Sequence, residues 1–221
     1  MYARILVPLD GSPESEQVLS HAQQVAQTFN ASIDLVSAVE PDQDVPESLV
    51  KDLEQERDAY LKGVASNLPG ELKPGSTVVL GRPAADVIIE QAEANGDTLI
   101  VMGTRGYSGL KRLMLGSVAH KVVQAATAPV LLIPPNAKSP EGGPVEFERL
   151  IVPLDGSELA EHILPYAIAA AKSLDMEVIL LRAYNPRFPG ATIRMHEVSK
   201  IVHDSAENYL QEKVKQLQSE G

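Results

Sequence analysis

The feature that most constrains this fold is an internal repeat. Residues 4–41 recur as residues 149–186, without a gap and at an offset of 145 positions. The two copies share VPLDGS outright and elsewhere mostly exchange similar residues. Six matching residues can arise by chance, but a register that extends over the whole segment is typical of repeated structural units. The chain therefore consists of two related modules.

Short apolar runs alternate with helical patterns along the first module. Five short runs are rich in valine, isoleucine and leucine, which is typical of strands buried on both faces. They are ILVPL, IDLVSAV, STVVL, TLIVM and APVLLIP. Four segments between these runs have apolar residues at helical spacing: residues 13–29, 46–67, 83–94 and 117–126. Alternating strands and helices with right-handed crossovers predict an α/β domain with an open, doubly wound parallel sheet of about five strands.

The second module is incomplete. Residues 134–148 hold four prolines and two glycines, so we assign 1–135 to a complete domain, 136–148 to a linker and 149–221 to a partial second copy. After the repeat, the strand EVILLRA and a long helix over about residues 193–217 follow, and nothing corresponds to residues 78–134. Half of a parallel sheet leaves an apolar face and a strand edge open, so this module must pack on something else or continue in a longer chain.

A glycine-rich loop, VMGTRGYSGLKRLMLGSV, connects the fourth predicted strand to the fourth predicted helix. Gly103, Gly106 and Gly116 are separated by two and nine residues, and Ser117, a favoured N-cap residue, lies in the first turn of the helix. Such a loop presents unpaired backbone N–H groups at a helix amino terminus, where the dipole favours an anion. Glycine also lets a ligand approach the backbone closely. The spacing predicts a phosphate-binding loop.

The charge of this loop supports the same hypothesis. Residues 103–121 include Arg105, Lys111, Arg112 and Lys121 and no acidic residue, whereas the whole chain has a net charge of -11. A local positive charge offsets the field that would repel a triphosphate. The alternative is that the glycines serve tight turns and the basic residues form a solvated face. The loop matches neither G-x4-G-K-[ST] nor G-x-G-x-x-G.

The end of the first strand is the second half of the expected site. In open doubly wound sheets, ligands bind at the carboxyl ends of strands where the strand order reverses. Asp10 is a candidate for a ribose hydroxyl or Mg²⁺, and the main chain around Leu9 is a candidate for a base. The alternative for Asp10 is an Asx-turn or helix cap before Pro13, and the two roles do not exclude each other.

Composition argues against several classes of function. The charge of -11 and the pI near 4.9 repel nucleic acids and anionic membranes. No run of about 18 apolar residues and no signal-peptide pattern occurs, so we expect a cytoplasmic protein without a membrane span. The absence of cysteine excludes disulfides and cysteine-based zinc sites.

Over residues 2–135 the chain resembles the universal stress protein family in three features. They are the opening ILVPLDGS, the motif G-x-x-G-x9-G-S after a Val/Ile-rich strand, and the closing PVLLIP. The second module resembles only the amino-terminal half of the same domain. The resemblance implies an adenine nucleotide α-hydrolase-like, Rossmann-like fold. Family members that keep this glycine motif bind ATP, so it also implies an ATP site, with Mg²⁺, in the first module.

The resemblance assigns eleven residues to this site. Pro8 and Leu9 would lie beside the base, Asp10 would contact ribose or Mg²⁺, and the Ala38 backbone would contact adenine. Met102 and Gly103 would border the ribose. The phosphates would be held by Gly106, Gly116, Ser117 and Val118, with Arg105 at a position that varies among such proteins.

The repeat and the resemblance also make predictions about stoichiometry. Asp155, Gly156 and Ser157 reproduce the signature of the first strand, but no glycine loop follows them, so we expect one nucleotide per chain. The resemblance implies a homodimer through APVLLIP, because the second module lacks a closing strand of its own.

The sequence shows no convincing catalytic set. Metal-binding spacing is absent from the five histidines His21, His120, His162, His196 and His203. Helix capping explains Ser12, Ser117 and Ser157. We therefore expect an ATP-binding stress-response regulator whose nucleotide occupancy controls its conformation or its binding of an unidentified protein. The alternatives are an interaction scaffold without nucleotide and a slow ATP hydrolase.

Overall fold

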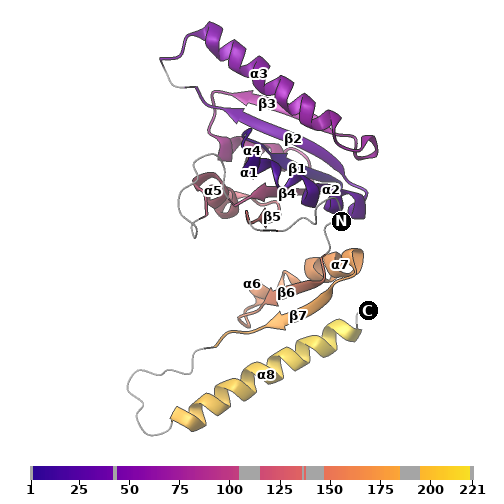
Figure 1. Cartoon of the computed structure of the whole chain (residues 1–221). Coiled ribbons are helices and arrows are strands. Elements are labelled where there is room, and N and C mark those ends of the chain that lie inside the picture. Colours follow the sequence, from indigo (N-terminus) through magenta and orange to yellow (C-terminus); the bar gives the residue numbers. More distant parts are fainter. Residues whose placement is uncertain are drawn as a thin grey trace. The chain divides into compact units, whose positions relative to one another are not determined.

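A computed structural model describes residues 2–41, 44–104, 115–135, 137, 147–184 and 195–219. The chain forms two compact units, Met1–Val145 and Glu146–Gly221, each with its own sheet (Figure 1). None of the helices in these described residues is long and apolar enough to cross a membrane.

The first unit contains a five-stranded parallel sheet in the order β3-β2-β1-β4-β5. Its strands are β1 (Arg4–Pro8), β2 (Ser32–Val39), β3 (Gly75–Leu80), β4 (Thr98–Gly103) and β5 (Val130–Ile133). The chain winds outward from β1 to β3, then crosses back to β4 on the other side of β1. The strand order therefore reverses between β1 and β4, which confirms the expected open, doubly wound α/β fold.

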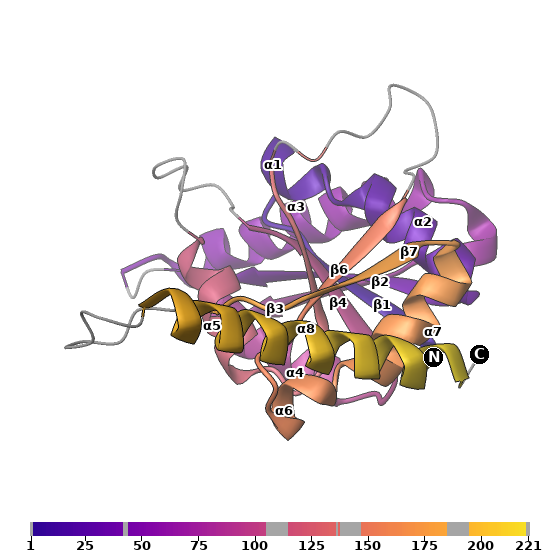
Figure 2. The ribbon, with the colours of Figure 1, turned by 90° about the horizontal axis from the view of Figure 1, so that it is seen from below.

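Helices cover both faces of this sheet. They are α1 (Pro13–Glu16), α2 (Leu19–Phe29), α3 (Glu47–Ser66), α4 (Ala84–Glu93) and α5 (Ser117–Ala125), with a short 3-10 helix, η1 (Gly70–Leu72). Figure 2 shows α2 and α3 on one side of the sheet and α4 and α5 on the other, as right-handed crossovers require for this strand order.

The core of the first unit lies on both faces of β1 and β4. Ile5, Leu6 and Val7 follow one another in β1 and are at most 1% exposed. Leu6 packs with Ile100 of β4 and Val122 of α5 in one apolar cluster. Burial on both faces explains why these strands are continuous apolar runs without polar alternation.

The structure differs from the predicted helix over residues 13–29, which is interrupted after its first turn. Gln17 and Val18 have ψ angles of -20° and -18°, values typical of 3-10 geometry, and they separate α1 from α2. Val18 is only 1% exposed. Apolar spacing continues through the break, so the pattern alone did not indicate it.

The second unit repeats the beginning of the first. It contains parallel strands β6 (Arg149–Pro153) and β7 (Glu177–Leu181) with helices α6 (Glu158–Glu161), α7 (Leu164–Leu174) and α8 (Met195–Ser219). The break between α6 and α7 recurs at the position of the break between α1 and α2. Val152, Leu164 and Ala167 form its core with Tyr209 and Leu210 of α8.

One face of the second sheet stays open. Leu6 is 1% exposed, whereas its repeat equivalent Ile151 is 58% exposed; Val36 is 2% exposed, whereas Leu181 is 52% exposed. In the first unit α4 and α5 cover this face, and the described part of the second unit has no equivalent of either helix.

Candidate functional site

A cavity of about 270 Å³ opens at the carboxyl ends of β1, β2 and β4. This volume is close to the lower end of the range for small-molecule sites, roughly 300–1,000 Å³. The cavity lies where the strand order reverses, which is the usual ligand position in an open α/β sheet.

Nine of the eleven residues expected from the sequence line this cavity. They are Pro8, Leu9, Asp10, Ala38, Met102, Gly103, Gly116, Ser117 and Val118. The other two, Arg105 and Gly106, lie outside the described residues, as do Lys111 and Arg112. Segments far apart in the sequence therefore meet at one end of the sheet.

Sequence reasoning missed five further lining residues: Ser15, Val36, Ala84, Ile88 and Ala119. Ala84 and Ile88 come from the first turns of α4, which lies over the same end of the sheet. The helical spacing of α4 was visible in the sequence, but its apolar face could equally have belonged entirely to the core. The small side chains of Ala38, Ala84 and Ala119 leave the space that forms the cavity.

The main chain of Ala38 faces the cavity. The N–H of Leu9 donates to the carbonyl oxygen of Val36 at 2.9 Å, so the backbone groups of Val36 point toward β1. Backbone groups alternate in direction along a strand, so those of Ala38 point the same way. Because β1 ends at Pro8, the N–H and C=O of Ala38 point past the end of β1 into the cavity. They provide one donor and one acceptor side by side.

One hydrogen bond joins the two ends of the glycine-rich loop, and another joins the start of the loop to β5. The N–H of Thr104 donates to the carbonyl oxygen of Ile133 at 3.0 Å, and the N–H of Gly116 donates to the carbonyl oxygen of Thr104 at 2.8 Å. Residues 105–114 lie outside the described residues. The hydrogen bond between Gly116 and Thr104 therefore holds the start of α5 beside the cavity.

The amino terminus of α5 is formed by Gly116 and not by the expected Ser117. Gly116 occupies the N-cap position, with φ of -61° and ψ of 153°, and makes no side-chain cap bond; Ser117 is the first helical residue. The amides of Ser117, Val118 and Ala119 therefore begin the helix without an intrahelical acceptor. All three residues line the cavity, where these amides and the helix dipole favour an anion.

Asp10 forms an Asx-turn before α1, which was the alternative to a ligand-binding role for this residue. Its Oδ1 accepts from the backbone N–H of Ser12 at 3.0 Å and from the Ser12 hydroxyl at 2.5 Å. Ser12 in turn caps α1, because its Oγ accepts from the N–H of Ser15 at 3.1 Å. Asp10 also lines the cavity, and a carboxylate has several acceptor positions. Capping and ligand contact are therefore compatible at this residue.

An arginine packs on the glycine of each DGS turn. Gly11 has φ of +83°, and a Cβ at this position would lie 2.5 Å from the Arg57 guanidinium. Gly156 has φ of +89°, and its Cβ would lie 3.0 Å from the guanidinium of Arg182. Arg57 comes from α3, whereas Arg182 follows β7. In both units an arginine guanidinium therefore lies against the glycine of the DGS turn, but the two arginines come from different elements.

A tyrosine–glutamate hydrogen bond is also repeated in the two units. The Tyr60 hydroxyl donates to Glu16 at 2.8 Å, and the Tyr209 hydroxyl donates to Glu161 at 2.8 Å. Burial, followed by this bond, raises the pKa of Tyr60, and the same two causes raise the pKa of Tyr209 to about 12. The partners are 44 residues apart in the first unit and 48 in the second, a difference of four residues. Tyr209 therefore identifies α8 as the counterpart of α3.

None of the histidines whose side chains the structure describes lines the cavity. His21 is 4% exposed on α2, and burial lowers its pKa. His120, three residues after Ser117, is exposed on α5 and is not a lining residue. His203 lies within 4.8 Å of Asp204 and Glu207 on α8, a grouping that the sequence spacing did not suggest. All three of these side chains are exposed, and none belongs to the cavity.

The fold and the cavity together define an open, doubly wound α/β protein with a pocket at its switch point. The chain belongs to the universal stress protein family, whose model matches residues 1–134. The chain is 34% identical to universal stress protein MJ0531 of Methanocaldococcus jannaschii, over 60% of this chain and 82% of that protein. It is 32% identical to universal stress protein YxiE of Bacillus subtilis, over 60% of this chain and 99% of that protein.

A solved structure extends the likeness in fold beyond the first unit. The crystal structure of a universal stress protein from Archaeoglobus fulgidus covers 92% of this chain and 73% of its own, with a TM-score of 0.65 and 21% identity. At this identity the likeness concerns the fold alone.

Proposed function

We propose that this stress-response protein binds ATP in the cavity of its first unit and that nucleotide occupancy controls its conformation or its binding of a partner protein. The observation that carries the proposal is the outward-pointing backbone pair of Ala38, which lines the same cavity as the amide-rich start of α5. The Ala38 backbone suits a base, and the start of α5 suits phosphates.

The Ala38 backbone favours adenine over guanine. Adenine presents the N6 amino group as a donor beside an acceptor nitrogen, which complements one C=O and one N–H. Guanine has an acceptor, O6, where adenine has the amino donor. A GTP molecule in the same pose would place O6 against the Ala38 carbonyl oxygen and leave both groups unpaired, which is costly in a cavity.

The phosphate end is supported by three kinds of group. The first amides of α5 and its dipole favour negative charge. The loop sequence supplies Arg105, Lys111 and Arg112 in a chain that is otherwise acidic. Asp10 offers a carboxylate to ribose or to Mg²⁺, which commonly binds through one or two carboxylates together with substrate phosphates. The residues present therefore fit a Mg-nucleotide.

A regulatory role fits this site better than rapid catalysis. Among the lining residues that the structure describes, Asp10 is the one ionisable side chain, and it already holds the turn at Ser12. Phosphoryl transfer needs a residue that orients the nucleophile as well as charge stabilisation. A bound nucleotide changes the protein by binding one conformation more tightly than another. We place the dimer contact at β5, whose outer edge ends the sheet.

The direct test combines ligand identification with titration. Native mass spectrometry of the purified chain is expected to detect retained adenine nucleotide, and calorimetry is expected to give at least about tenfold tighter binding of MgATP than of MgGTP, or about 1.4 kcal/mol. Phosphate release should be slow relative to typical enzyme turnover, about 10 per second. The absence of thermal stabilisation by any nucleotide would instead favour the scaffold, and rapid phosphate release would favour the hydrolase.

A further inference from the structure

Ser15 is a buried polar residue in the lining of the first unit's cavity. It lies in α1 and is 6% exposed. Its hydroxyl donates to the carbonyl oxygen of Ser12 at 2.9 Å, and the backbone N–H of Asp10 approaches the same hydroxyl oxygen at 3.4 Å. The hydroxyl therefore lies beside Asp10, just past the carboxyl end of β1.

The second unit shows that the turn before α1 forms without this hydroxyl. The repeat places Ala160 at the position of Ser15. The N–H of Ser157 donates to Asp155 at 2.8 Å, and the N–H of Ala160 donates to the Ser157 hydroxyl oxygen at 3.1 Å. The matching bonds of the first unit are 3.0 Å and 3.1 Å long. The same Asx-turn and the same helix cap are thus made with alanine at this position.

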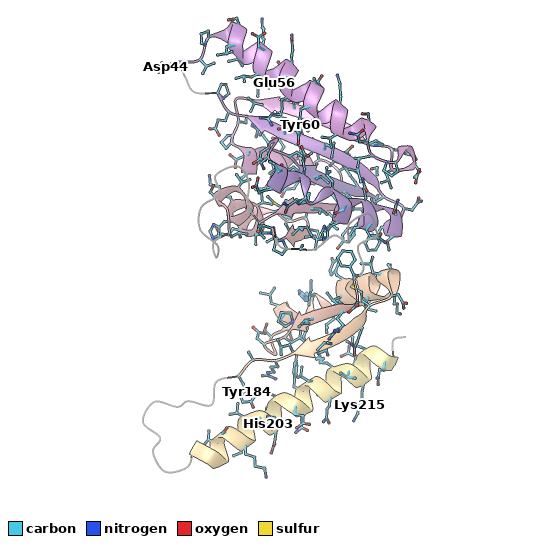
Figure 3. All side chains as sticks on the ribbon, viewed as in Figure 1. Asp44, Glu56, Tyr60, Tyr184, His203 and Lys215 are labelled. Carbon is cyan, nitrogen blue, oxygen red and sulfur yellow. The ribbon has the colours of Figure 1, made fainter. Side chains whose placement is uncertain are left out.

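The short helices that follow the two turns are also held alike. Glu16 follows Ser15 in α1 and accepts from the hydroxyl of Tyr60 on α3 at 2.8 Å (Figure 3). In the second unit, Glu161 of α6 accepts from the hydroxyl of Tyr209 at the same distance. Neither the turn nor the anchoring of the helix therefore requires a serine at position 15.

The serine is also the one polar difference between the two copies at the lining positions that the repeat covers. Six lining residues lie within the repeated segment. Four of them are unchanged in the second copy, and Val36 is replaced by the apolar Leu181. The unchanged pairs are Pro8 and Pro153, Leu9 and Leu154, Asp10 and Asp155, and Ala38 and Ala183. Ser15 thus adds a single hydroxyl to this part of the cavity.

The bonds that the hydroxyl already makes limit the group that it can bind. A serine hydroxyl has one donor hydrogen and two acceptor lone pairs. Ser12 takes the hydrogen and the Asp10 N–H takes at most one lone pair, so one acceptor position remains among the described contacts. Ionised phosphate oxygens are acceptors and cannot fill it. The amino donor of adenine is matched by the Ala38 carbonyl oxygen, which leaves the hydroxyls of the ribose as donors.

We propose that the Ser15 hydroxyl oxygen accepts a hydrogen bond from a ribose hydroxyl of the nucleotide, beside the Asp10 carboxylate. The inference rests on the proposed function, because it assigns a further residue to the same nucleotide. Ribose presents two neighbouring hydroxyl donors, and Asp10 and Ser15 offer two neighbouring acceptors in the cavity lining. A site that bonds a substrate hydroxyl rejects the analogue that lacks it. The site therefore selects ribonucleotides over deoxyribonucleotides.

The test is a calorimetric titration of the full chain with ATP, 2′-deoxy-ATP and 3′-deoxy-ATP, each with Mg²⁺. The native chain is expected to bind ATP at least about fivefold more tightly than each deoxy compound, the affinity change of one neutral hydrogen bond. Ser15→Ala should weaken the binding of ATP about fivefold and leave the affinity for one of the two deoxy compounds unchanged. The lost preference identifies the hydroxyl that Ser15 contacts, and a merely structural role would not produce it.

Ala160→Ser is the matched control, because it adds the same hydroxyl to the second unit and should leave all three affinities unchanged. Thermal unfolding of Ser15→Ala should stay close to that of the native chain, since alanine forms the same turn at position 160. Equal losses for all three nucleotides, or preferences for ATP that survive in Ser15→Ala, would overturn the inference and leave the nucleotide site standing. Failure of the native chain to bind any of the three would overturn the proposed function as well.

Discussion

The backbone N–H of Gly116 donates to the carbonyl oxygen of Thr104 at 2.8 Å, which joins the two ends of the glycine-rich loop. The bond fixes the start of α5, whose first three residues line the cavity. A preformed site loses less conformational entropy when it binds than one that must order itself. Gly116 is therefore the position where a substitution tests phosphate binding most directly.

Gly116→Asp should lower the affinity for ATP more than tenfold while the protein stays folded. The φ of -61° suits any residue, and aspartate is favoured at an N-cap. Its carboxylate would bind the amides of α5 and repel phosphate. Calorimetry measures the affinity, and thermal unfolding checks the fold. Gly116→Ser adds a cap without charge and should cost less affinity; equal losses in the two variants would argue against phosphate at this helix end.

Each chain should bind one nucleotide. The turn at Asp155 and Ser157 reproduces the turn at Asp10 and Ser12, with a hydrogen bond of 2.8 Å from the Ser157 N–H to Asp155. However, no glycine motif follows it in the sequence. Calorimetric titration should give a stoichiometry near one for the native chain and for Asp155→Asn, and only weakened binding for Gly116→Asp. A second tight site that survives Gly116→Asp would contradict this prediction.

Tyr209→Phe should lower the free energy of unfolding by about 1 kcal/mol, the usual contribution of one hydrogen bond. The change removes the donor to Glu161 but leaves the ring and the 2.6 Å bond from Lys213 to the same carboxylate. Urea denaturation measures the loss. Tyr166, whose side chain is 52% exposed on α7, provides the matched control, and Tyr166→Phe should change stability by less than half as much.

His21 should make the protein less stable in mild acid. Burial lowers the pKa of His21 below 6.5, so the unfolded chain binds a proton at this residue before the folded chain does. The free energy of unfolding should therefore fall as the pH drops below about 6.5, by up to about 1.4 kcal/mol per pH unit until the folded-state pKa is reached. Denaturation at pH 7.5 and 5.5 measures the fall. His21→Asn should reduce it, and an unchanged pH dependence in that variant would refute the assignment.

Much of this fold could be predicted because buried parallel strands have a strong sequence pattern. All five strands of the first unit lie within or beside the apolar runs that predicted them. The break at Gln17 and Val18 could not be predicted, because it changes ψ without changing the apolar spacing. The cap at Gly116 was missed because serine is the stronger N-cap former, and sequence preference does not fix helix bounds to one residue.

The candidate site was predicted less completely than the fold. Residues that carry a motif, such as Gly116, or that end a strand, such as Asp10, could be placed at the sheet edge from topology alone. Ala84 and Ile88 are apolar residues of an ordinary amphipathic helix, and only the three-dimensional path of α4 brings them to the cavity. The equivalence of α3 and α8 was likewise hidden, because it depends on a tyrosine four residues out of the repeat register.

That four-residue shift shows how the two copies could change length and still make the same contact. Four residues advance a helix by about 400°, which is only about 40° more than a complete turn. An added length of two residues would have swung the tyrosine ring to the opposite side of α8, away from Glu161. A shift of four residues within α8 thus leaves the tyrosine on nearly the same face of the helix, where its hydroxyl still reaches the carboxylate of Glu161.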